Sequence, residues 1–497
     1  MITTDRMAAV DANAAALGVP RKQLMESSGN AVASEVRSAA EPGATVVLCC
    51  GRGNNGGDAF VAARFLSAYD VTVALLGRPE SIRTDIAREN WEALVDAEVP
   101  TETVTDSTDF ELGEPDVVVD AMLGSGVTGA LREPERSAAR AINASDATVV
   151  AVDVPSGIDA DTGDPTGADT GDPTGADTGD PTAIRGDPPA VEADRVVTFH
   201  DRTPGLDALD AAVTVADIGI PAAAERFTGP GDLLGIDRDP ASHKGDNGEV
   251  LVVGGGPYTG APSLTARAAL RTGADLVRVA CPETVAREIQ GFSADLIVRD
   301  LPGDRIGPNH LDRIRDLAAE NDVVVLGPGL GDGDGTADFV RAFLDDYDGR
   351  AVVDADALRV VPEVDTDADL ICTPHQGELV GMGGETADDP GERGDLVRSF
   401  AAEIGHTLLV KGAYDVVTDG DDVRLNRTGN PGMTVGGTGD VLAGATGALV
   451  AQTDAFGAAA VGAYVTGTAG DLVADERGYG LVATDLLDRL PEAMRDA

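Results

Sequence analysis

The sequence predicts an α/β protein of two domains, each a three-layer αβα arrangement around a parallel sheet. Short runs of Val, Leu, Ile and Ala recur along the chain and are typical of buried parallel strands. Most runs end in a turn rich in Gly, Asp or Ser, and a segment with helical spacing follows. This alternation predicts sheets covered by helices on both faces. Because 497 residues exceed one ordinary core, we expect two domains, over residues 1–221 and 227–497.

The composition is strongly and evenly acidic. The formal net charge is −49, from 86 Asp and Glu against 37 Lys and Arg, and only Lys22, Lys244 and Lys411 are lysines. Such a surface stays soluble by self-repulsion and is screened at high salt. It resembles that of a salt-adapted, halophilic archaeal protein. Nucleic-acid binding requires basic patches, so we expect no nucleic-acid partner.

Cysteines and targeting segments give no sign of a metal centre or a membrane. The four cysteines lack metal-ligand spacing, so buried free thiols are expected. No signal peptide opens the chain, and no run of about 18 apolar residues occurs. We expect a cytoplasmic protein with small-molecule substrates, a homo-oligomeric state and no membrane partner.

The first half opens with helical spacing over 7–37, and its first strand is 45–50. That strand leads into Gly51-Arg-Gly-Asn-Asn-Gly-Gly-Asp58 and an expected helix over 59–68, which is a Rossmann-like, mononucleotide-binding layout. The amides and carboxylate of this loop suit a ribose, a carboxamide or a cation, or they only shape the loop. Further strands are expected over 71–76, 116–120, 147–153 and 191–199.

Three more polar residues follow strands on the same predicted rim. Asp120 ends one strand, Asp153 ends the next, and Ser156 lies in the Pro-Ser-Gly turn that follows it. Ligands bind at the carboxyl ends of strands in open α/β sheets. Oxygen donors of this kind suit a hard monovalent cation or magnesium. Alternatively, Asp120 is a turn cap and Ser156 a simple turn residue.

Three motifs are the glycine loop 51–58, Val119-Asp-Ala-Met-Leu-Gly-Ser-Gly126 and Asp153-Val-Pro-Ser-Gly-Ile-Asp159. Together they resemble the NAD(P)HX epimerase family, the YjeF N-terminal domain, over about residues 1–221. The resemblance implies that Asn55, Asp120 and Ser156 coordinate potassium and that Asp153 is a catalytic residue in contact with the substrate. It also implies two segments that hold the hydrated nicotinamide nucleotide. Their residues are Asn54, Asn55, Gly56, Gly57, Asp58, Gly124, Ser125, Gly126, Val127, Thr128, Gly129 and Ala130.

A tandem repeat interrupts this domain. Asp-Thr-Gly-Asp-Pro-Thr-Gly-Ala occurs almost three times over 161–182, beginning at Asp161, Asp169 and Asp177. The repeat has no apolar residue larger than Ala or Pro, so we expect a mobile loop that does not pack. A calcium-binding repeat is the alternative, although the apolar anchors of a β-roll are missing.

The second half follows an expected linker at 227–232 and repeats the α/β pattern. Its strands are expected over 249–253, 274–280, 322–326, 351–358, 369–378 and 407–415. Near its end, Asn430-Pro-Gly-Met-Thr-Val-Gly-Gly-Thr-Gly-Asp440 precedes a helix of small apolar residues. Glycine N–H groups and a helix N-terminus together form a hole for a phosphate. Asp440 at its mouth could take a proton from a hydroxyl; alternatively it caps the helix.

Two further side chains are candidates. His375 follows Thr-Pro at a strand end, where it contacts a ligand or, alternatively, is a turn residue bonded to Glu378. Lys411 is one of only three lysines, so a compact ammonium facing phosphate is favoured over chance retention.

Five motifs of this half resemble the ADP/ATP-dependent NAD(P)H-hydrate dehydratase family over about 227–497. They are His243-Lys-Gly-Asp, 254–262, 327–331, Thr373-Pro-His-x-Gly-Glu and 430–440. The resemblance implies a ribokinase-like fold and an adenine nucleotide bound with magnesium. The residues implied to face the hydrate are Ala261, Gly329, His375 and the catalytic Asp440. Those implied to bind the nucleotide are Lys411, Gly412, Ala413, Tyr414, Asp415 and Gly439.

Both resemblances in this order imply bifunctional NAD(P)H-hydrate repair. One domain would interconvert the epimers of hydrated NADH or NADPH. The other would dehydrate the S epimer at the expense of ADP or ATP, giving AMP or ADP and phosphate. Two alternatives remain: a ribokinase-like kinase for a vitamin-type alcohol, and an N-terminal domain that serves only as a binding scaffold.

Overall fold

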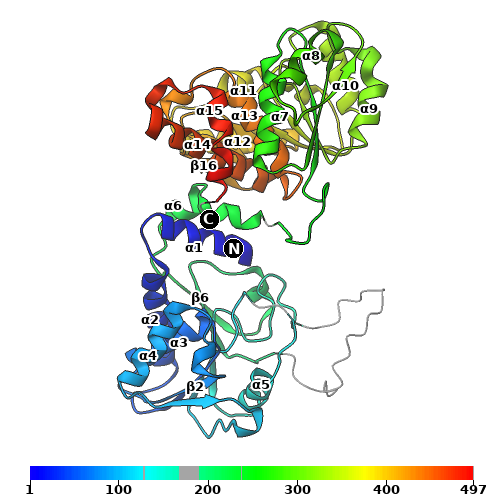
Figure 1. Cartoon of the computed structure of the whole chain (residues 1–497). Coiled ribbons are helices and arrows are strands. Elements are labelled where there is room, and N and C mark those ends of the chain that lie inside the picture. Colours follow the sequence, from blue (N-terminus) through cyan, green and yellow to red (C-terminus); the bar gives the residue numbers. More distant parts are fainter. Residues whose placement is uncertain (127–128, 167–189, 237, 496–497) are drawn as a thin grey trace. The chain divides into compact units, whose positions relative to one another are not determined.

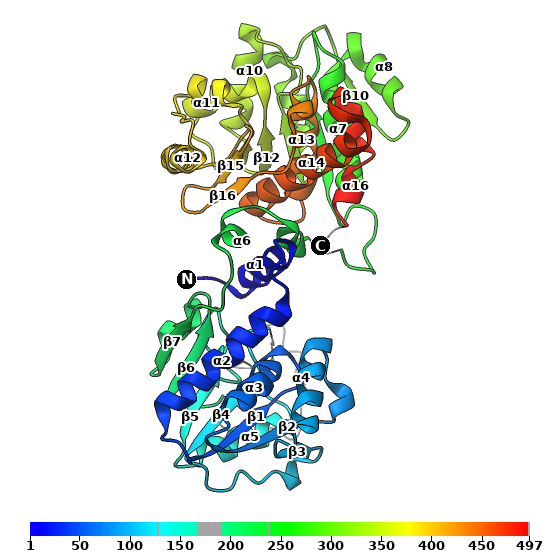
Figure 2. The ribbon, with the colours of Figure 1, turned by 90° about the vertical axis from the view of Figure 1, so that its left-hand side faces the viewer.

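The computed structural model describes residues 1–126, 129–166, 190–236 and 238–495. It divides into two compact units, Met1–Pro221 and Ala222–Ala497 (Figures 1 and 2). Val127, Thr128 and the repeat residues 167–182 lie outside the described residues. The four cysteines are free and buried, as expected. Within the described ranges, no helix is both long and apolar enough to span a bilayer.

In the described part of the first unit, the strands form one parallel sheet in the order β3-β2-β1-β4-β5-β6-β7. Successive side chains point to opposite faces. Leu48 therefore joins the core under α2, α3 and α4, while Cys49 joins the core under α5. Both faces are covered, which confirms the αβα layers. The strands are β1 (Thr45–Cys50), β2 (Asp70–Leu76), β3 (Thr101–Val104), β4 (Val117–Ala121), β5 (Thr148–Val152), β6 (Arg195–Phe199) and β7 (Ala212–Ala216).

The helices of this unit differ from the expected ranges in two places. The helical region expected over 7–37 is broken between α1 and α2, where Pro20 precedes the second helix. Helix α3 includes the Asn-Asn-Gly-Gly-Asp motif, which was expected as a loop. A Cβ at Gly56 would lie 2.1 Å from the Gly51 carbonyl oxygen, so close packing requires glycine there. The helices are α1 (Thr4–Ala16), α2 (Arg21–Ala39), α3 (Asn54–Phe65), α4 (Asp85–Asp96) and α5 (Glu135–Asn143).

The start of the repeat is held in place, contrary to the expectation of a loop without contacts. Asp161 accepts a hydrogen bond from the Thr4 amide at 3.0 Å, and the Thr166 amide donates to the Gly157 carbonyl at 2.7 Å. These bonds are polar, and one of them joins distant parts of the chain, which is why a count of apolar residues did not predict them.

Deleting residues 161–176 is expected to leave epimerisation and the stability of the first unit nearly unchanged. The deletion removes two whole copies, and Asp177-Thr-Gly-Asp-Pro-Thr182 then follows Ala160 in place of Asp161–Thr166. The same side chains are thus available for the bonds to Thr4 and Gly157, and shortening a long loop changes its closure entropy little. Rate assays and thermal unfolding would check this. A loss of rate beyond about tenfold, which is about 1.4 kcal/mol in barrier, would assign a function to the repeat.

The described strands of the second unit form a larger sheet in the order β10-β9-β8-β11-β12-β13-β14-β15-β16. The expectation of a wholly parallel sheet is wrong at one edge, where β14, β15 and β16 pair antiparallel. The expected strand 407–415 is thus a strand and a turn, because the chain reverses after Val410. The strands are β8 (Glu249–Val253), β9 (Leu276–Pro282), β10 (Ile297–Leu301), β11 (Val323–Leu326), β12 (Arg350–Val353), β13 (Asp369–Cys372), β14 (Thr407–Val410), β15 (Asp415–Thr418) and β16 (Val423–Asn426).

Three other segments depart from expectation. The strand expected over 369–378 ends at Cys372, and a helix begins at Gln376. The strand expected over 351–358 ends at Val353, and a 3₁₀ helix follows over Ala355–Glu363. The expected linker packs against β16, since the Thr228 amide donates to the Leu425 carbonyl at 2.9 Å.

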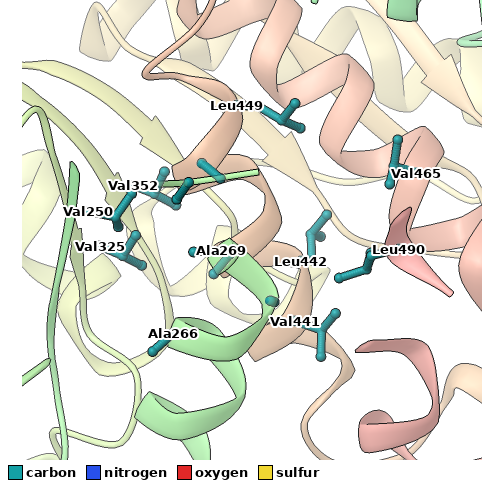
Figure 3. Close-up of a cluster of buried hydrophobic side chains, with 14 of the residues drawn as sticks. Val250, Ala266, Ala269, Val325, Val352, Val441, Leu442, Leu449, Val465 and Leu490 are labelled. Carbon is teal, nitrogen blue, oxygen red and sulfur yellow. The ribbon is translucent and has the colours of Figure 1, made fainter. Parts of the chain in front are cut away.

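Two cores cover the faces of this sheet. On one face Val250, Val325 and Val352 meet helices α7, α13 and α14 (Figure 3). Small residues bring these helices close, because a Cβ at Gly444 would lie 2.0 Å from the Thr265 carbonyl oxygen. Helices α9 to α12 cover the other face. The helices are α7 (Gly260–Thr272), α8 (Glu283–Phe292), α9 (Leu311–Ala318), α10 (Asp334–Leu344), α11 (Gln376–Met382), α12 (Pro390–Ile404), α13 (Thr438–Leu449), α14 (Ala455–Arg477), α15 (Ala483–Leu487) and α16 (Leu490–Ala493).

Candidate functional site

The carboxyl ends of the first unit's strands open into a cavity of about 730 Å³. Several of the predicted residues line it, from α3, from the turn after β4 and from the end of β5. They are Asn54, Asn55, Asp58, Gly124, Ser125, Gly126 and Asp153. The expected rim of polar groups is therefore a cavity large enough for a small-molecule ligand.

Asp120 and Ser156 form one buried polar group beneath this cavity. The Ser156 amide donates to Asp120 Oδ2 at 2.7 Å, and its hydroxyl donates to Asp120 Oδ1 at 2.6 Å. The Leu123 amide donates to the Ser156 hydroxyl at 2.9 Å. Burial raises the pKa of Asp120 to about 6, although the bonds from Ser156 and Met122 oppose the rise. An ionised Asp120 at neutral pH is a carboxylate taken out of water, which favours a cation beside it.

Asn55 supplies an unsatisfied polar group at the wall of the cavity. Both its Nδ2 and its Oδ1 are buried, and neither has a hydrogen-bond partner among the described residues. A Cβ at Gly124 would lie 3.3 Å from Asn55 Cγ, so the two residues are in contact. Buried amides are normally paired. An unpaired one that lines a cavity is therefore a candidate ligand for a bound group.

Asp153 follows the end of β5 and also lies next to Gly124. Its backbone is left-handed, with φ of 68°, and its Oδ2 accepts a hydrogen bond from the Ser125 amide at 2.9 Å. A Cβ at Gly124 would lie only 3.1 Å from that oxygen. Burial raises the pKa of Asp153, and the bonds from Ser125 and Thr198 oppose it. Strained backbone of this kind concentrates at functional sites.

Two other carboxyls share the cavity with Asp153. Burial, and then the charges of Asp153 and Asp11, raise the pKa of Asp58 well above its ordinary value. Burial also raises the pKa of Asp11, with Arg21 and His200 opposing and Asp153 adding to the rise. Perturbed carboxyls gathered in a cavity are typical of acid–base sites.

The remaining predicted residues of this unit lie differently. Gly56 and Gly57 are buried inside α3 and serve its packing. Gly129 and Ala130 are described but are not among the residues that line the cavity.

In the second unit, Asp440, Lys411 and Asp354 come together at the carboxyl ends of the strands. Lys411 Nζ lies 2.9 Å from Asp354 Oδ1 and 3.9 Å from Glu378 Oε2. The Thr373 hydroxyl donates to the same oxygen of Asp354 at 2.8 Å. Burial tends to lower the pKa of Lys411, but the carboxylates around it, with Asp354 first, raise it above its ordinary value. The ammonium is therefore charged.

Asp440 lies in the first turn of α13 and is not its cap. The N-cap residue is Gly437, whose φ of 100° is left-handed and which makes no side-chain cap bond. Burial raises the pKa of Asp440 to about 7; Asp354 adds to the rise and Lys411 opposes it. A Cβ at Gly439 would lie 3.3 Å from Lys411 Nζ, so the glycine turn lies next to the Lys411 ammonium. A base with this pKa is half ionised near neutral pH.

The β14–β15 turn holds the other residues predicted to bind the nucleotide. The Gly412 amide donates to Asp415 Oδ1 at 2.9 Å, and Asn426 donates to Asp415 Oδ2 at 2.9 Å. Burial raises the pKa of Asp415 to about 6, and these bonds, with the charges of Lys411 and Arg393, oppose it. Ala413 and Tyr414 complete the turn.

His375 caps α11, as its alternative interpretation has it. Its Nδ1 accepts from the Glu378 amide at 3.0 Å, and its own amide donates to Glu378 Oε2 at 2.8 Å. The ring remains about 60% exposed, so the capping bonds leave most of it accessible. Ala261 lies in the first turn of α7, and a Cβ at Gly329 would lie 3.2 Å from Tyr258 Cβ in the loop before α7.

Comparison with known proteins decides the family. The bifunctional NAD(P)H-hydrate repair enzyme Nnr of Methanothermobacter thermautotrophicus is 45% identical over 511 residues, covering 98% of this chain and 94% of the relative. The chain belongs to the family of bifunctional NAD(P)H-hydrate repair enzymes. The Nnr of Archaeoglobus fulgidus is 41% identical, covering 99% of this chain and 98% of the relative.

Two family models agree with the repair-enzyme assignment. Residues 21–205 match the model for the YjeF-related protein N-terminus, and residues 250–492 match the model for NAD(P)H-hydrate dehydratase. The crystal structure of ADP/ATP-dependent NAD(P)H-hydrate dehydratase from Bacillus subtilis, co-crystallised with ATP/Mg²⁺, is 26% identical. It covers 54% of this chain and 97% of that chain, with a TM-score of 0.47.

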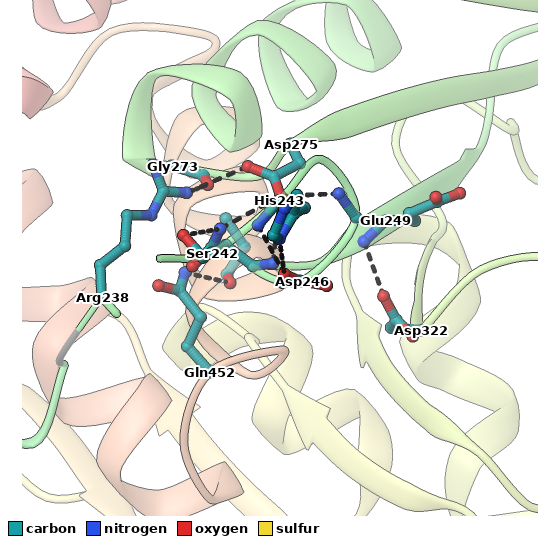
Figure 4. Close-up of polar contacts among 12 residues, drawn as sticks. Arg238, Ser242, His243, Asp246, Glu249, Gly273, Asp275, Asp322 and Gln452 are labelled. Carbon is teal, nitrogen blue, oxygen red and sulfur yellow. Dashed lines mark hydrogen bonds and ion pairs between the residues drawn. The ribbon is translucent and has the colours of Figure 1, made fainter. Parts of the chain in front are cut away.

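One motif of the repair-enzyme resemblance lies away from the Asp440 cluster. The His243-Lys-Gly-Asp loop precedes β8, at the amino ends of the parallel strands (Figure 4). Asp275 Oδ2 accepts from the amides of Gly245 and Asn247 at 2.9 and 3.1 Å. The motif is therefore a loop fixed by hydrogen bonds at the opposite edge from Asp440.

Sequence reasoning missed three groups in the two sites. Asp354 lay within a segment expected to be one strand, and Asp11 was one of 86 acidic residues. Arg52, which lines the cavity of the first unit, was not singled out within its glycine loop. A signal for Asp11 exists, because Thr4, Met7, Ala8 and Asp11 share one helical face.

Proposed function

We propose that this chain restores hydrated NADH and NADPH through two activities, an epimerase in the first unit and an ADP- or ATP-dependent dehydratase in the second. The observation that carries the proposal is that each unit gathers perturbed acids and glycine turns at the carboxyl edge of its own sheet. Full-length similarity to bifunctional repair enzymes supports the pairing. The cytoplasmic location and the homo-oligomeric state remain predictions.

In the epimerase, the hydrated nucleotide occupies the 730 Å³ cavity with its nicotinamide ring beside Asp153. The C6 carbon carries both the hydroxyl and the ring nitrogen N1, so the nitrogen lone pair can expel the hydroxyl. A protonated carboxyl gives the departing group its proton, and water then returns to the ring. Asp153 is the residue placed to hold or move this proton.

Potassium fits the buried group under the cavity. The unpaired Asn55 amide, the Asp120 carboxylate and the Ser156 hydroxyl are hard oxygen donors, with no sulfur or imidazole among them. When bound, the ion would supply positive charge that keeps Asp120 ionised. These residues would thereby fix the turn of Leu123 and Gly124 against the substrate.

In the dehydratase, Asp440 takes the proton from the C6 hydroxyl as that oxygen attacks the terminal phosphorus of the nucleotide. The Gly436–Gly439 amides and Lys411 neutralise the charge on the transferred phosphoryl group. The C6–O bond then breaks with loss of phosphate, and a proton leaves C5 to restore the double bond. Hydroxide is a poor leaving group and phosphate a good one, which explains the need for a nucleotide. Magnesium would arrive with the nucleotide as part of the substrate.

Incubation of the enzyme with mixed hydrate epimers and ADP, or ATP, tests the proposal. We expect the near-ultraviolet absorbance of the reduced nicotinamide to return completely, with both epimers consumed and AMP or ADP released. Recovery of only one epimer would remove the epimerase from the proposal. A stable phosphorylated product without recovered absorbance would identify the second unit as a small-molecule kinase instead.

A further inference from the structure

We propose that Asp11 is a second acid–base residue of the epimerase and acts on the face of the nicotinamide ring opposite to Asp153. This inference rests on the epimerase function proposed above. It assigns a chemical role to a residue of the N-terminal helix, outside all the motifs on which the family resemblance depends.

The need for two groups follows from the chemistry of inversion. The C6–O bond breaks as the N1 lone pair forms a C6–N1 double bond, and an acid on that face protonates the departing hydroxide to water. A water molecule then adds to C6 from the other face and gives its proton to a carboxylate there. Atoms and charge balance, since one carboxyl loses a proton and the other gains one. A single carboxyl serves only one face.

Asp11 lies on helix α1, which forms a separate part of the cavity wall. The helix lies across the carboxyl edge of the sheet (Figure 2). Its start is tied there, because the Ile2 amide donates to the Arg202 carbonyl at 3.0 Å and Thr4 bonds to Asp161. The cavity-lining residues of α1 have helical spacing, and Asp11 is the ionisable one among those described. They are Thr4, Met7, Ala8 and Asp11.

Asp153 approaches from the strand side. It follows β5 and contacts Gly124, which in turn contacts Asn55 at the start of α3. A ring bound in the cavity can therefore be approached by Asp11 from α1 and by Asp153 from the end of β5.

The charged groups around Asp11 suit proton exchange. Arg21, His200, Asp153 and Asp58 are its titratable neighbours. Burial is the main reason that the pKa values of Asp11 and Asp153 are both raised. Inversion in either direction requires that one of these two carboxyls holds a proton while the other accepts one. Burial and the charges of Asp153 and Asp11 raise the pKa of Asp58 well above its ordinary value, which favours the protonated form of its carboxyl.

The test follows oxygen exchange in ¹⁸O-labelled water, with purified epimers and without nucleotide, so that the second unit consumes nothing. For the wild-type chain we expect inversion in both directions, with solvent oxygen incorporated at C6. Asp11→Asn is expected to lower inversion by about 10²–10⁴-fold in both directions, with KM little changed. One epimer then still exchanges its hydroxyl oxygen at the wild-type rate, and the other does not.

Asp11→Glu and Asp5→Asn are the companion variants. The glutamate keeps a carboxyl and is expected to recover part of the inversion, which a merely structural role would not require. Asp5 is exposed on the same helix and does not line the cavity, so its variant should behave as wild type. Wild-type inversion in Asp11→Asn, or equal loss of exchange from both epimers in both Asp11 variants, would overturn the inference. Inversion without incorporation of ¹⁸O at C6 would also overturn the inference, because it would show that the ring opens instead of exchanging its hydroxyl with water. Failure of the wild-type chain itself to invert would instead contradict the proposed function.

Discussion

Asp440→Asn is expected to lower dehydration by about 10²–10⁴-fold and to leave epimerisation unchanged. Asparagine has the same shape but cannot accept the hydroxyl proton. The side chain is not the cap of α13, so the substitution removes no capping bond. Burial and Asp354 disfavour the charge of Asp440, whereas Lys411 favours it, so a neutral side chain of the same shape is expected to cost little stability.

The measurement is the recovery of reduced nicotinamide from the purified S epimer, beside the epimerisation rate of the same preparation. The first unit thus serves as an internal check on folding. Asp312→Asn, at a fully exposed position of α9, is the matched control and is expected to keep both rates. Normal recovery in the Asp440 variant would exclude that residue as the base.

The pH dependence of dehydration also tests whether Asp440 is the base. Burial and Asp354 raise the pKa of Asp440 to about 7, so the carboxylate form that accepts a proton increases as pH rises through that value. We expect kcat/KM to rise with pH up to about 7 and then to level. A profile already flat from pH 5 would mean that another group is the base.

Potassium is expected to increase both the epimerisation rate and the thermal stability of the first unit. Binding to the folded state alone adds RT ln(1 + [K⁺]/Kd), which is about 2.7 kcal/mol at a hundredfold excess over Kd. Asp120→Ala is expected to weaken cation binding and epimerisation together. It also leaves the Ser156 amide without its acceptor, at a cost of about 1–3 kcal/mol, whereas the Ser156 hydroxyl can still donate to the Leu123 carbonyl at 3.2 Å.

The variant Asn55→Leu distinguishes the loss of cation binding from the loss of hydrogen bonds within the protein. The Asn55 amide has no partner among the described residues, so its removal breaks no hydrogen bond of the protein there. Without potassium the variant is therefore expected to be at least as stable as wild type, whereas with potassium it shows no gain in rate or stability. A retained potassium response would exclude Asn55 from the site.

Ionic strength must be held constant in these assays, with a large organic cation as the replacement. A chain of net charge −49 responds to any salt through screening. If the rate and the unfolding temperature are the same in either cation, the Asp120–Ser156 group is only a structural hydrogen-bond pair.

The buried central strands could be predicted from sequence, and the short edge strands could not. Runs such as Thr45–Cys50 are buried on both faces, so their composition alone identifies them. The edge strand Ala212–Ala216 has no fully buried residue, and Ile297–Leu301 has one, so these runs give a weaker signal. The start of α3 was missed for a different reason, since Asn and Gly are poor helix formers and tertiary packing overrides their preference.

For the sites, sequence could place groups that follow strands, because parallel strands deliver their ends to one edge. Asn55, Asp153, Lys411 and Asp440 belong to this class. Asp11 does not, because only the path of α1 brings it to the cavity. The partnership of Lys411 with Asp354 likewise depends on where β12 ends and the 3₁₀ helix begins.

The exactness of the repeat has a consequence for inheritance. The residues that tie the turn after β5 to α1 and to Gly157 occur in the same order at the start of every copy. A gene that loses or gains a whole copy by slippage during replication therefore still encodes those anchors at the same junction. Copy number can drift between lineages without selection against the fold, whereas a change of a fraction of a copy would displace the anchors and be removed.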